Sequence, residues 1–202
     1  MVAIHNFTVV GLVGLILNGE DGVTVVGGTG CKVKDNFLME NGWQTDDEYR
    51  GLYISAMTDV SIYHNSIINS TNQVYVWVPS SVNWTGRWNV TGNYWSDYTG
   101  DDADGDGIGE DPYVINTSTY ETKDHKDYFP FMNPYLPGDI NHDGKVDMRD
   151  ISTIARAYGT TPEDENWNPK ADLYEDGFID MTDINIATEN FGKTWQDFWG
   201  IE

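Results

Sequence analysis

The sequence has little cysteine and little positive charge. Cys31 is the only cysteine of the 202 residues, which excludes an internal disulfide and a metal site built on several thiolates. We expect its side chain to be a small buried apolar group. Lysine and arginine number 11 against 33 aspartates and glutamates, so the formal net charge is −22. A surface this acidic repels nucleic acid and anionic lipid and favours divalent cations as partners.

Long apolar runs are absent as well. The sequence has no stretch of about 20 apolar residues, so we expect no membrane insertion. The run from Phe7 to Leu17 has the length of the apolar part of a secretion signal, but it lacks a preceding basic segment and a small-residue cleavage site. We expect this run to belong to the fold and the chain to start inside a longer secreted protein.

The composition is that of a folded, exported protein. Hydrophobic residues make up 39% of the chain and aromatic residues 13%, which is enough to build a core. Asn-x-Ser/Thr sequons occur five times where chance would give about two. Their excess favours an extracellular or cell-surface location. The candidate glycosylation sites are Asn6, Asn69, Asn83, Asn89 and Asn116.

The first half of the chain contains a repeat of nearly constant spacing. Its copies start at Asn6, Asn36, Asn65 and Asn93. Apolar residues at alternate positions before Asn36 and Asn65 indicate strands with one buried face. A strand-rich repeat with asparagine at a fixed place favours a parallel β-helix, in which the amides of stacked coils bond one another. A β-sandwich with accidental spacing is the alternative.

A proline-rich segment, 128–138, separates the two halves. Its prolines disfavour helix and interrupt strand pairing. We therefore expect one domain over 1–132, a connector over 133–138 and a second domain over 139–202. The predicted fold class is mainly β: a short right-handed parallel β-helix, followed by a small α-helical domain with EF-hand-like calcium loops.

The second domain contains its own repeat. Residues 139–159 align with 172–192, and each copy has an acidic loop, a helix-length segment and a glycine. The helices are expected at 151–158 and 184–191. Gly159 and Gly192 suit the left-handed conformation that ends a helix.

Both acidic loops have the spacing of a 12-residue calcium loop. Calcium binds six to eight hard oxygens, and glycine at position 6 permits the sharp turn. Position 7 binds through its carbonyl, and position 9 through water. Position 3 of the second loop is Tyr174, a poor ligand, so either a water fills the gap or the second site is weaker. The predicted ligands are Asp139, Asn141, Asp143, Lys145, Asp147 and Asp150 in the first loop, and Asp172, Tyr174, Asp176, Phe178, Asp180 and Asp183 in the second.

A third acidic loop spans 101–111. Asp102, Asp104 and Asp106, followed by Gly107, match the start of a calcium loop, but the twelfth position is Tyr113. A third cation site is favoured over an exposed acidic turn.

Two loop–helix units resemble the dockerin family, because each loop ends in aspartate at position 12 and no helix is expected before the loop. The segment from Asn166 to Asp172 is similar to the linker of archaeal-type dockerins, and the resemblance covers about 139–195. It implies a non-catalytic module that calcium folds and that binds a cohesin-like domain. Partner-binding residues are implied at loop positions 10 and 11, where many dockerins carry Ser/Thr pairs. Packing of the two methionines in the module's own core is the alternative. The implied partner-binding residues are Met148, Arg149, Met181 and Thr182.

The segment before the connector resembles a second family. The string from Gly92 to Tyr113, closed by Asp127 to Pro130, is similar to the end of NosD-like β-helix domains, and the match covers about 1–132. Members of this family include carbohydrate-acting proteins, surface proteins and copper-site maturation factors. The resemblance therefore implies a fold rather than an activity.

The sequence has no convincing catalytic constellation. It has no nucleophile motif, phosphate loop or Cys/His cluster, so we expect a protein that is not an enzyme. Asp35 and His64 occupy equivalent places in the repeat and are expected to be neighbours on successive coils. Two alternatives stay open: a carbohydrate-binding or polysaccharide-acting fragment, and a fibre or surface layer built from identical subunits.

Overall fold

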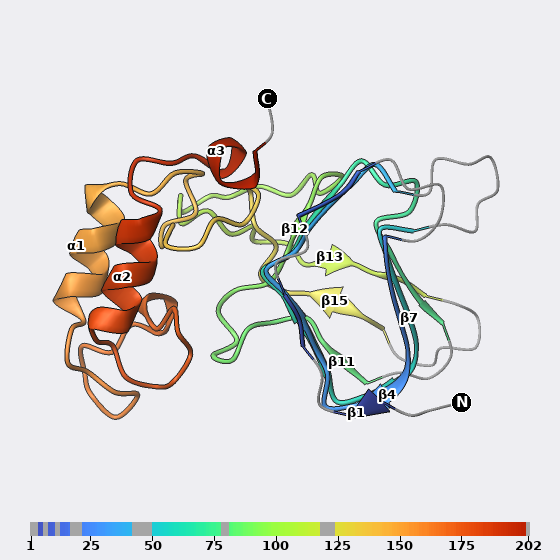
Figure 1. Cartoon of the computed structure of the whole chain (residues 1–202), viewed down its shortest axis with the longest axis horizontal. Coiled ribbons are helices and arrows are strands. Elements are labelled where there is room, and N and C mark those ends of the chain that lie inside the picture. Colours follow the sequence, from blue (N-terminus) through green and yellow to red (C-terminus); the bar gives the residue numbers. More distant parts are fainter. Residues whose placement is uncertain are drawn as a thin grey trace.

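The computed structural model describes residues 4–5, 8–10, 13–16, 22–41, 50–77, 81–117 and 124–200, with side chains from residue 22 onward. The described part is mainly β with short helices near the C-terminal end, as Figure 1 shows. The prediction of a mainly β fold followed by a small helical module is confirmed. We call the described residues between 4 and 132 the coil region, and residues 139–200 the module.

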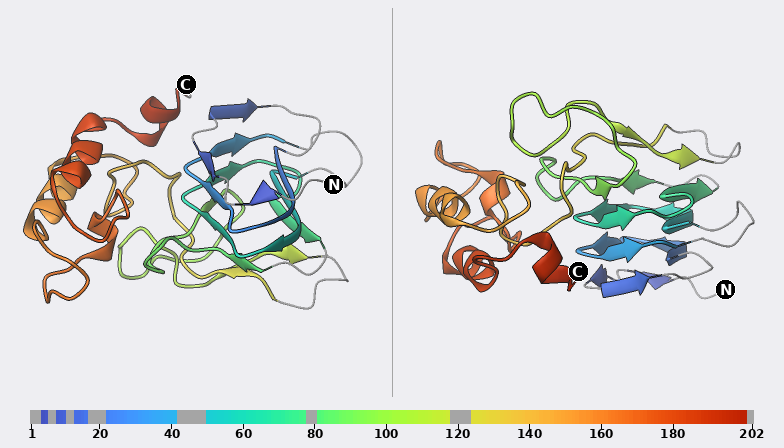
Figure 2. Two further views of the ribbon diagram at one scale, coloured as in Figure 1. Left: turned by 60° about the horizontal axis from the view of Figure 1, so that its bottom comes forward. Right: turned by 90° about the horizontal axis from the view of Figure 1, so that it is seen from above.

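Three parallel sheets form the coil region. The first has the order β1 (Ile4–His5), β4 (Val23–Thr29), β7 (Leu52–Thr58), β10 (Val74–Trp77) and β14 (Asn116–Thr117). The second has the order β2 (Thr8–Val10), β5 (Lys32–Lys34), β8 (Val60–Tyr63) and β11 (Val82–Asn83). The third has the order β3 (Val13–Ile16), β6 (Phe37–Met39), β9 (Ser66–Ile68) and β12 (Tyr94–Trp95). The chain thus passes once through each sheet per turn, and successive turns stack (Figure 2).

Alternating side chains fill the interior of these coils. In the first sheet, Val25 pairs with Ile54, which pairs with Val76, and all three side chains are buried. Apolar residues at every second position therefore stack into rungs, because a strand directs successive side chains to opposite faces. At the corner between the second and third sheets, Asp35 and His64 both have a left-handed backbone, with φ of 57°.

A column of buried asparagines follows this corner. The Nδ2 of Asn36 donates to the Oδ1 of Asn65 over 2.8 Å, and the Nδ2 of Asn65 donates to the Oδ1 of Asn93 over 2.9 Å. Asn93 in turn donates to the Oδ2 of Asp127 over 3.1 Å. The expected asparagine stacking is therefore present from Asn36 onward, and a carboxylate ends it.

The predicted equivalence of Asn6 and Asn36 is wrong. Val10 pairs with Lys34 and Val13 pairs with Phe37, so the equivalent of Asn36 falls between β2 and β3, whereas Asn6 precedes β2. In the next coil Phe37 pairs with Ser66, which makes Asn36 and Asn65 equivalent as predicted. The first coil is therefore shorter than the second, because the loops between the strands differ in length. Asn6 itself lies outside the described residues.

The remaining β elements close the coil region. β13 (Tyr113–Val114) pairs antiparallel with β15 (Lys126–Asp127). Phe131 forms isolated bridges with Tyr94 and Ile108, which ties the segment after β15 to the last coil.

The module contains α1 (Met148–Arg156), a 3₁₀ turn η1 (Pro169–Ala171), α2 (Met181–Glu189) and α3 (Trp195–Trp199). Both α1 and α2 begin earlier than predicted, at Met148 and Met181. Asp147 and Asp180 act as N-caps with capping boxes, so the last loop residues already form the first helical turn. Gly159 and Gly192 follow the helices with φ of 82° and 81°.

The module packs against the side of the coil stack (Figure 2). The ring of Trp199 lies 5.2 Å from that of Phe37, and its Nε1 donates to the carbonyl of Tyr135 over 2.9 Å. Tyr135 and Leu136, in the segment expected to be a connector, are buried. Among the described residues, no helix has the length and apolar character needed to cross a membrane.

Candidate calcium-binding loops

The first loop folds around two carboxylates that backbone N–H groups hold. Asp139 is only 4% exposed and accepts hydrogen bonds from the N–H groups of Asp143 (3.1 Å) and Gly144 (2.8 Å). Asp150, also buried, accepts from those of Ile140 (2.8 Å) and Asp147 (2.8 Å). Backbone hydrogen bonds alone therefore hold the carboxylates at loop positions 1 and 12 in place.

The second loop repeats this arrangement. Asp172 accepts from the N–H groups of Asp176 (3.2 Å) and Gly177 (3.0 Å), at the same loop positions. Asp183 accepts from those of Tyr174 (3.0 Å) and Asp180 (2.8 Å). The two loops therefore share one conformation.

Left-handed residues shape both turns. Position 4 is His142 in the first loop and Glu175 in the second, with φ of 51° and 60°. Position 6 is Gly144 and Gly177, with φ of 89° and 91°. Glycine carries little penalty at such angles, whereas the two non-glycine residues are held there by the loop as a whole.

The loops differ at position 3. Asn141 lies beside its neighbouring ligand, and its Nδ2 donates to the Oδ2 of Asp143 over 3.2 Å. The second loop has Tyr174 at this place, which offers no carboxylate or amide oxygen and is 62% exposed. At position 7, Lys145 directs its ammonium to the Oδ2 of Asp147 (3.3 Å), and Phe178 is exposed.

The charge within the loops suits a divalent cation. The pKa of Asp139 is raised to about 7, chiefly by burial and also by the neighbouring carboxylates of Asp150 and Asp143, while backbone hydrogen bonds oppose the shift. Burial also raises the pKa of Asp172, helped by Asp183 and Asp176. Negative groups that converge in a partly buried place repel one another unless a cation lies between them. Because the donors are all oxygens, these residues fit calcium.

The third acidic loop has the same turn as the other two. Asp102 accepts from the N–H groups of Asp106 (3.1 Å) and Gly107 (3.0 Å), at positions 5 and 6. Ligand atoms of Asp102, Asp104 and Asp106 all lie within 4.8 Å of one another. The ammonium of Lys170 lies 2.7 Å from the Oδ2 of Asp106, so a protein cation already neutralises part of this cluster.

The residues predicted to contact a partner are exposed at the starts of the two helices. Met148 is 60% and Met181 52% exposed, so neither is packed in the module's core. Arg149 and Thr182, which follow them, are exposed as well. Figure 1 places α1 and α2 on the side of the module away from the coil region.

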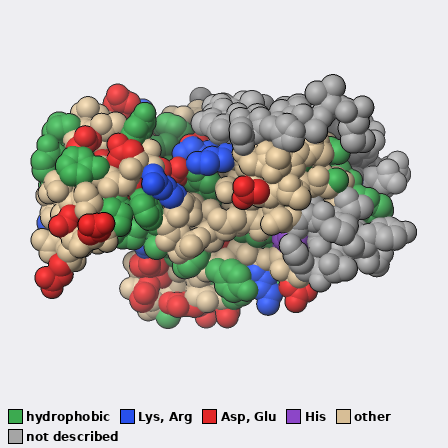
Figure 3. All heavy atoms as spheres, turned by 90° about the horizontal axis from the view of Figure 1, so that it is seen from below, with side chains coloured by type: hydrophobic (Ala, Val, Ile, Leu, Met, Phe, Trp, Pro, Cys, Tyr) green, Lys and Arg blue, Asp and Glu red, His purple; other side chains and the backbone are tan. Residues whose placement is uncertain are grey.

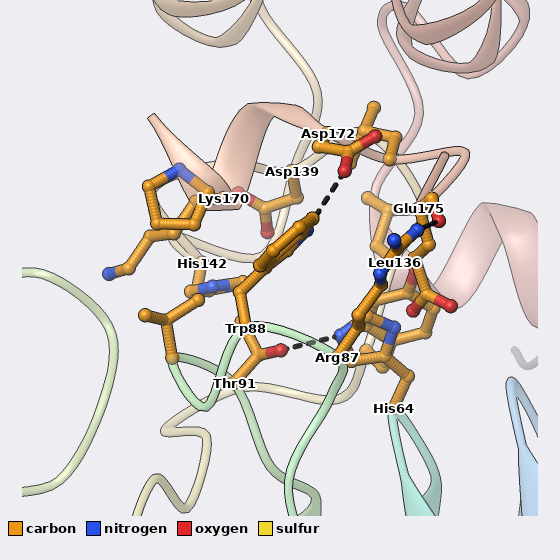
Figure 4. Close-up of a pocket in the computed structure, with 15 residues that line it drawn as sticks. His64, Arg87, Trp88, Thr91, Leu136, Asp139, His142, Lys170, Asp172 and Glu175 are labelled. Carbon is orange, nitrogen blue, oxygen red and sulfur yellow. Dashed lines mark hydrogen bonds between the residues drawn. The ribbon is translucent and has the colours of Figure 1, made fainter. Parts of the chain in front are cut away.

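The Asp35–His64 pair is enclosed between the coil region and the module. The Nδ1 of His64 lies 3.5 Å from the Oδ1 of Asp35, and its Nε2 bonds the hydroxyl of Thr91 over 2.8 Å. Burial would raise the pKa of Asp35, but the hydrogen bond and charge of His64, with Lys34, hold it below its ordinary value. The adjoining cavity, shown in Figure 4, has a volume of about 30 Å³, which holds water but no sugar ring.

Reasoning from the sequence missed the contacts of two carboxylates. Trp88, in the coil region, donates to Asp172 over 2.8 Å, and a separation of 84 residues leaves no local pattern to follow. Asp127 accepts hydrogen bonds from Asn93, Trp95 and Phe129 deep in the coil region. Its place in the closing segment Asp127–Pro130 was the only available signal.

The acidic surface and the sequons are accessible. Figure 3 shows one face with many acidic and few basic side chains. Asn6 falls outside the described residues, and the other sequon asparagines are at least partly exposed. These are Asn69, Asn83, Asn89 and Asn116. Their glycosylation stays a prediction.

Residues 137–190 match the family model of the dockerin type I domain. No curated protein and no solved structure is significantly similar to the chain. Dockerin domains bind calcium, occur in extracellular proteins and dock onto cohesin domains. The prediction of a dockerin domain is therefore confirmed for this segment, while the archaeal type and the NosD-like domain before it stay predictions.

Proposed function

We propose that this chain is part of a secreted or cell-surface protein and that its module docks it, in a calcium-dependent and non-catalytic way, onto a cohesin-like domain. The dockerin match over 137–190 supports the proposal, and so do the equivalent hydrogen bonds from positions 5 and 6 to position 1 in both loops. Calcium would be held by the predicted ligands of both loops. The third loop, with its Asp102 cluster, is a further candidate for a cation.

The loops link ion binding to helix formation. Calcium, when bound, would neutralise the converging carboxylates of each loop. Asp150 closes the first loop and also occupies the third position of α1, where it completes a capping box with Asp147. Asp183 does the same for α2 with Asp180. An ordered loop therefore supplies the N-cap of the helix that follows, and such a cap contributes about 1 kcal/mol to stability.

The partner surface follows from what is left exposed. Met148 and Met181 begin α1 and α2 at equivalent places in the two loop–helix units, and each stands beside a polar residue, Arg149 or Thr182. Exposed methionines adapt to the shape of a partner. A cohesin-like domain bound there would meet the helices on the side away from the coil region.

For the coil region we propose a right-handed parallel β-helix of the NosD-like kind, as one domain over 1–132. The one-strand-per-sheet order of the coils and the asparagine column support this. We also propose that it has no catalytic role. Asp35 and His64 are the pair that the repeat places side by side. Among the described residues, Tyr135 and the module cover this pair, which leaves no open site for a substrate there.

A second candidate function is assembly with identical copies. Among the described residues, β1, β2 and β3 each pair with a strand on one side only. An unpaired strand edge is a template for another chain. Sedimentation velocity at rising protein concentration tests this: a growing mass supports assembly, and a constant monomer mass excludes it.

The experiment that tests the docking proposal is a calorimetric titration of the chelator-stripped chain with Ca²⁺, followed by circular dichroism. We expect two or three bound ions and a gain of helix. The loaded protein should then bind immobilised cohesin domains, and Met148→Asp with Met181→Asp should abolish that binding without changing the calcium titration. No calcium binding, with the helix signal already complete, would overturn the proposal.

A further inference from the structure

We propose that Trp88 of the coil region positions the first calcium ligand of the second loop, so that calcium binding there and docking of the module onto the coil region strengthen each other. This inference rests on the proposed calcium function of the loop. It goes beyond that function by assigning a role to residues outside the loop.

The central contact is a hydrogen bond to Asp172. The Nε1 of Trp88 donates to the Oδ2 of Asp172 over 2.8 Å (Figure 4). The same oxygen accepts the N–H of Gly177, and the other oxygen accepts that of Asp176. Three donors from two parts of the molecule therefore fix this carboxylate. Removing a group that orients a metal ligand by a hydrogen bond typically weakens metal binding about 10- to 100-fold.

The indole is held where it can make this bond. Its ring meets that of Trp167 edge-on, with 5.4 Å between centroids, and the guanidinium carbon of Arg87 lies 4.6 Å from its centroid. A Cβ built on Gly177 would be 3.8 Å from the indole, so the turn that carries Trp88 lies directly over the loop. The indole is thus a fixed donor rather than a mobile surface group.

A second contact fastens the tip of the loop. The hydroxyl of Tyr63 donates to the Oε2 of Glu175 over 2.9 Å, and the ammonium of Lys34 lies 3.5 Å from the same oxygen. Arg87 donates to the backbone carbonyl of Glu175. Glu175 reaches these partners from a left-handed backbone, φ 60°, which the folded loop imposes. Any ion that stabilises the folded loop therefore also stabilises the docked arrangement.

In the described part of the chain, the ligand carboxylates of the first loop lack a donor from outside the loop. Among the described residues, the hydrogen bonds to Asp139 and Asp150 all come from N–H groups of their own loop. The second loop, which has Tyr174 at position 3, is the one that a distant residue assists. Trp88 would offset part of the affinity lost with the missing oxygen. Linkage then requires that calcium stabilise the Trp88 contact by the same factor.

The first test compares calcium titrations of the full chain. Trp88→Phe keeps an aromatic ring and removes the N–H donor. We expect it to raise the dissociation constant of one site by about tenfold or more and to leave the other sites unchanged. Trp77→Phe is the matched control, because β10 belongs to the sheet that lies on the far side from α1 and α2 (Figure 1).

The second test measures hydrogen exchange of residues 85–91 with and without calcium. We expect calcium to slow exchange there in the wild type and in Asp143→Ala, which disables the first loop. In Asp176→Ala, the same change in the second loop, calcium should no longer protect this turn. Only variants that keep the wild-type helix signal in calcium are compared. If either loop variant loses that signal, the calcium titration of Trp88→Phe alone decides the test.

The outcomes separate the inference from the proposed function. Unchanged affinities in Trp88→Phe, with calcium binding intact, would overturn the inference and leave the docking proposal standing. Protection of 85–91 that persists in Asp176→Ala would do the same. Failure of the wild type to bind calcium at all would overturn the docking proposal itself.

Discussion

Asp127 is a buried carboxylate placed at the end of a column of amides. Its Oδ2 accepts from the backbone and side-chain N–H groups of Asn93 and from Trp95, and its Oδ1 accepts from Phe129. Burial raises its pKa to about 6, although these donors oppose the shift. The neighbouring Gly92 has no room for a side chain, because a Cβ there would collide with this carboxylate.

The raised pKa predicts a pH dependence of stability. An acid whose pKa is higher in the folded than in the unfolded state stabilises the fold at low pH, and this contribution is lost as pH rises through the folded-state pKa, about 6. We expect the free energy of unfolding of the wild type, relative to Asp127→Asn, to fall by about 2 kcal/mol between about pH 4.5 and about pH 7. Urea unfolding in excess calcium measures it. A difference that does not vary with pH would contradict the prediction.

Tyr174 occupies the third position of the second loop, where the first loop has Asn141. Replacing it by asparagine supplies the amide oxygen that Asn141 provides in the first loop. We expect Tyr174→Asn to tighten calcium binding at the second site by roughly tenfold, because affinity grows with the number of oxygen ligands. Calorimetric titration measures the affinity of each site. Asn141→Ala, which removes the equivalent oxygen from the first loop, should weaken binding there. Equal affinity before and after would mean that water already fills position 3 equally well.

The asparagine column connects three successive coils. Asn65 donates to Asn93, to the carbonyl of Val33 over 2.9 Å and to that of Tyr63 over 3.0 Å, and it accepts from Asn36. Because all these groups are buried, removing the amide leaves several without partners. We expect Asn65→Ala to lower the free energy of unfolding by at least about 3 kcal/mol.

Urea unfolding of the full chain measures this loss. Asn185→Ala, at an exposed site on α2, is the control and should change the stability little. Equal stabilities of the two variants would show that the column is not a structural support.

Elements with local signals were predictable from the sequence. The turns of the two acidic loops were predictable, because their carboxylates and glycines fall at fixed short spacings. The asparagine column was predictable from Asn36 onward, where successive coils have nearly equal lengths. The first coil was not, because its shorter length follows from its loops, which leave no periodic trace. Trp88 and Lys170 contact Asp172 and Asp106 only after the whole chain has folded.

At the scale of the whole molecule, the coil region and the module meet partly through the two acidic loops of the module. His142, at the tip of the first loop, packs its ring 4.4 Å from that of Phe131, and Glu175, at the tip of the second, bonds Tyr63. If calcium orders both loops, its removal releases both tips. The docked arrangement should therefore be calcium-dependent.

Small-angle X-ray scattering tests this dependence. A compact chain of this length has a radius of gyration of about 17 Å. We expect a value near this in calcium, and a clear increase on chelation, because the module separates from the coil region as its loops lose order. A radius that stays constant while the helix signal falls would contradict the prediction, since it would mean that the contact survives without ordered loops.

The module packs against the side of the coil stack and contacts three successive coils there. Phe37 meets Trp199, Tyr63 meets Glu175, and Trp88 meets Asp172. A tension applied through a partner on α1 and α2 would therefore act on three contacts at once rather than on one end coil. Contacts loaded in parallel must break together, which takes more force than peeling them apart in sequence. If the module docks as proposed, this sideways attachment would spread a pulling force over three coils instead of one.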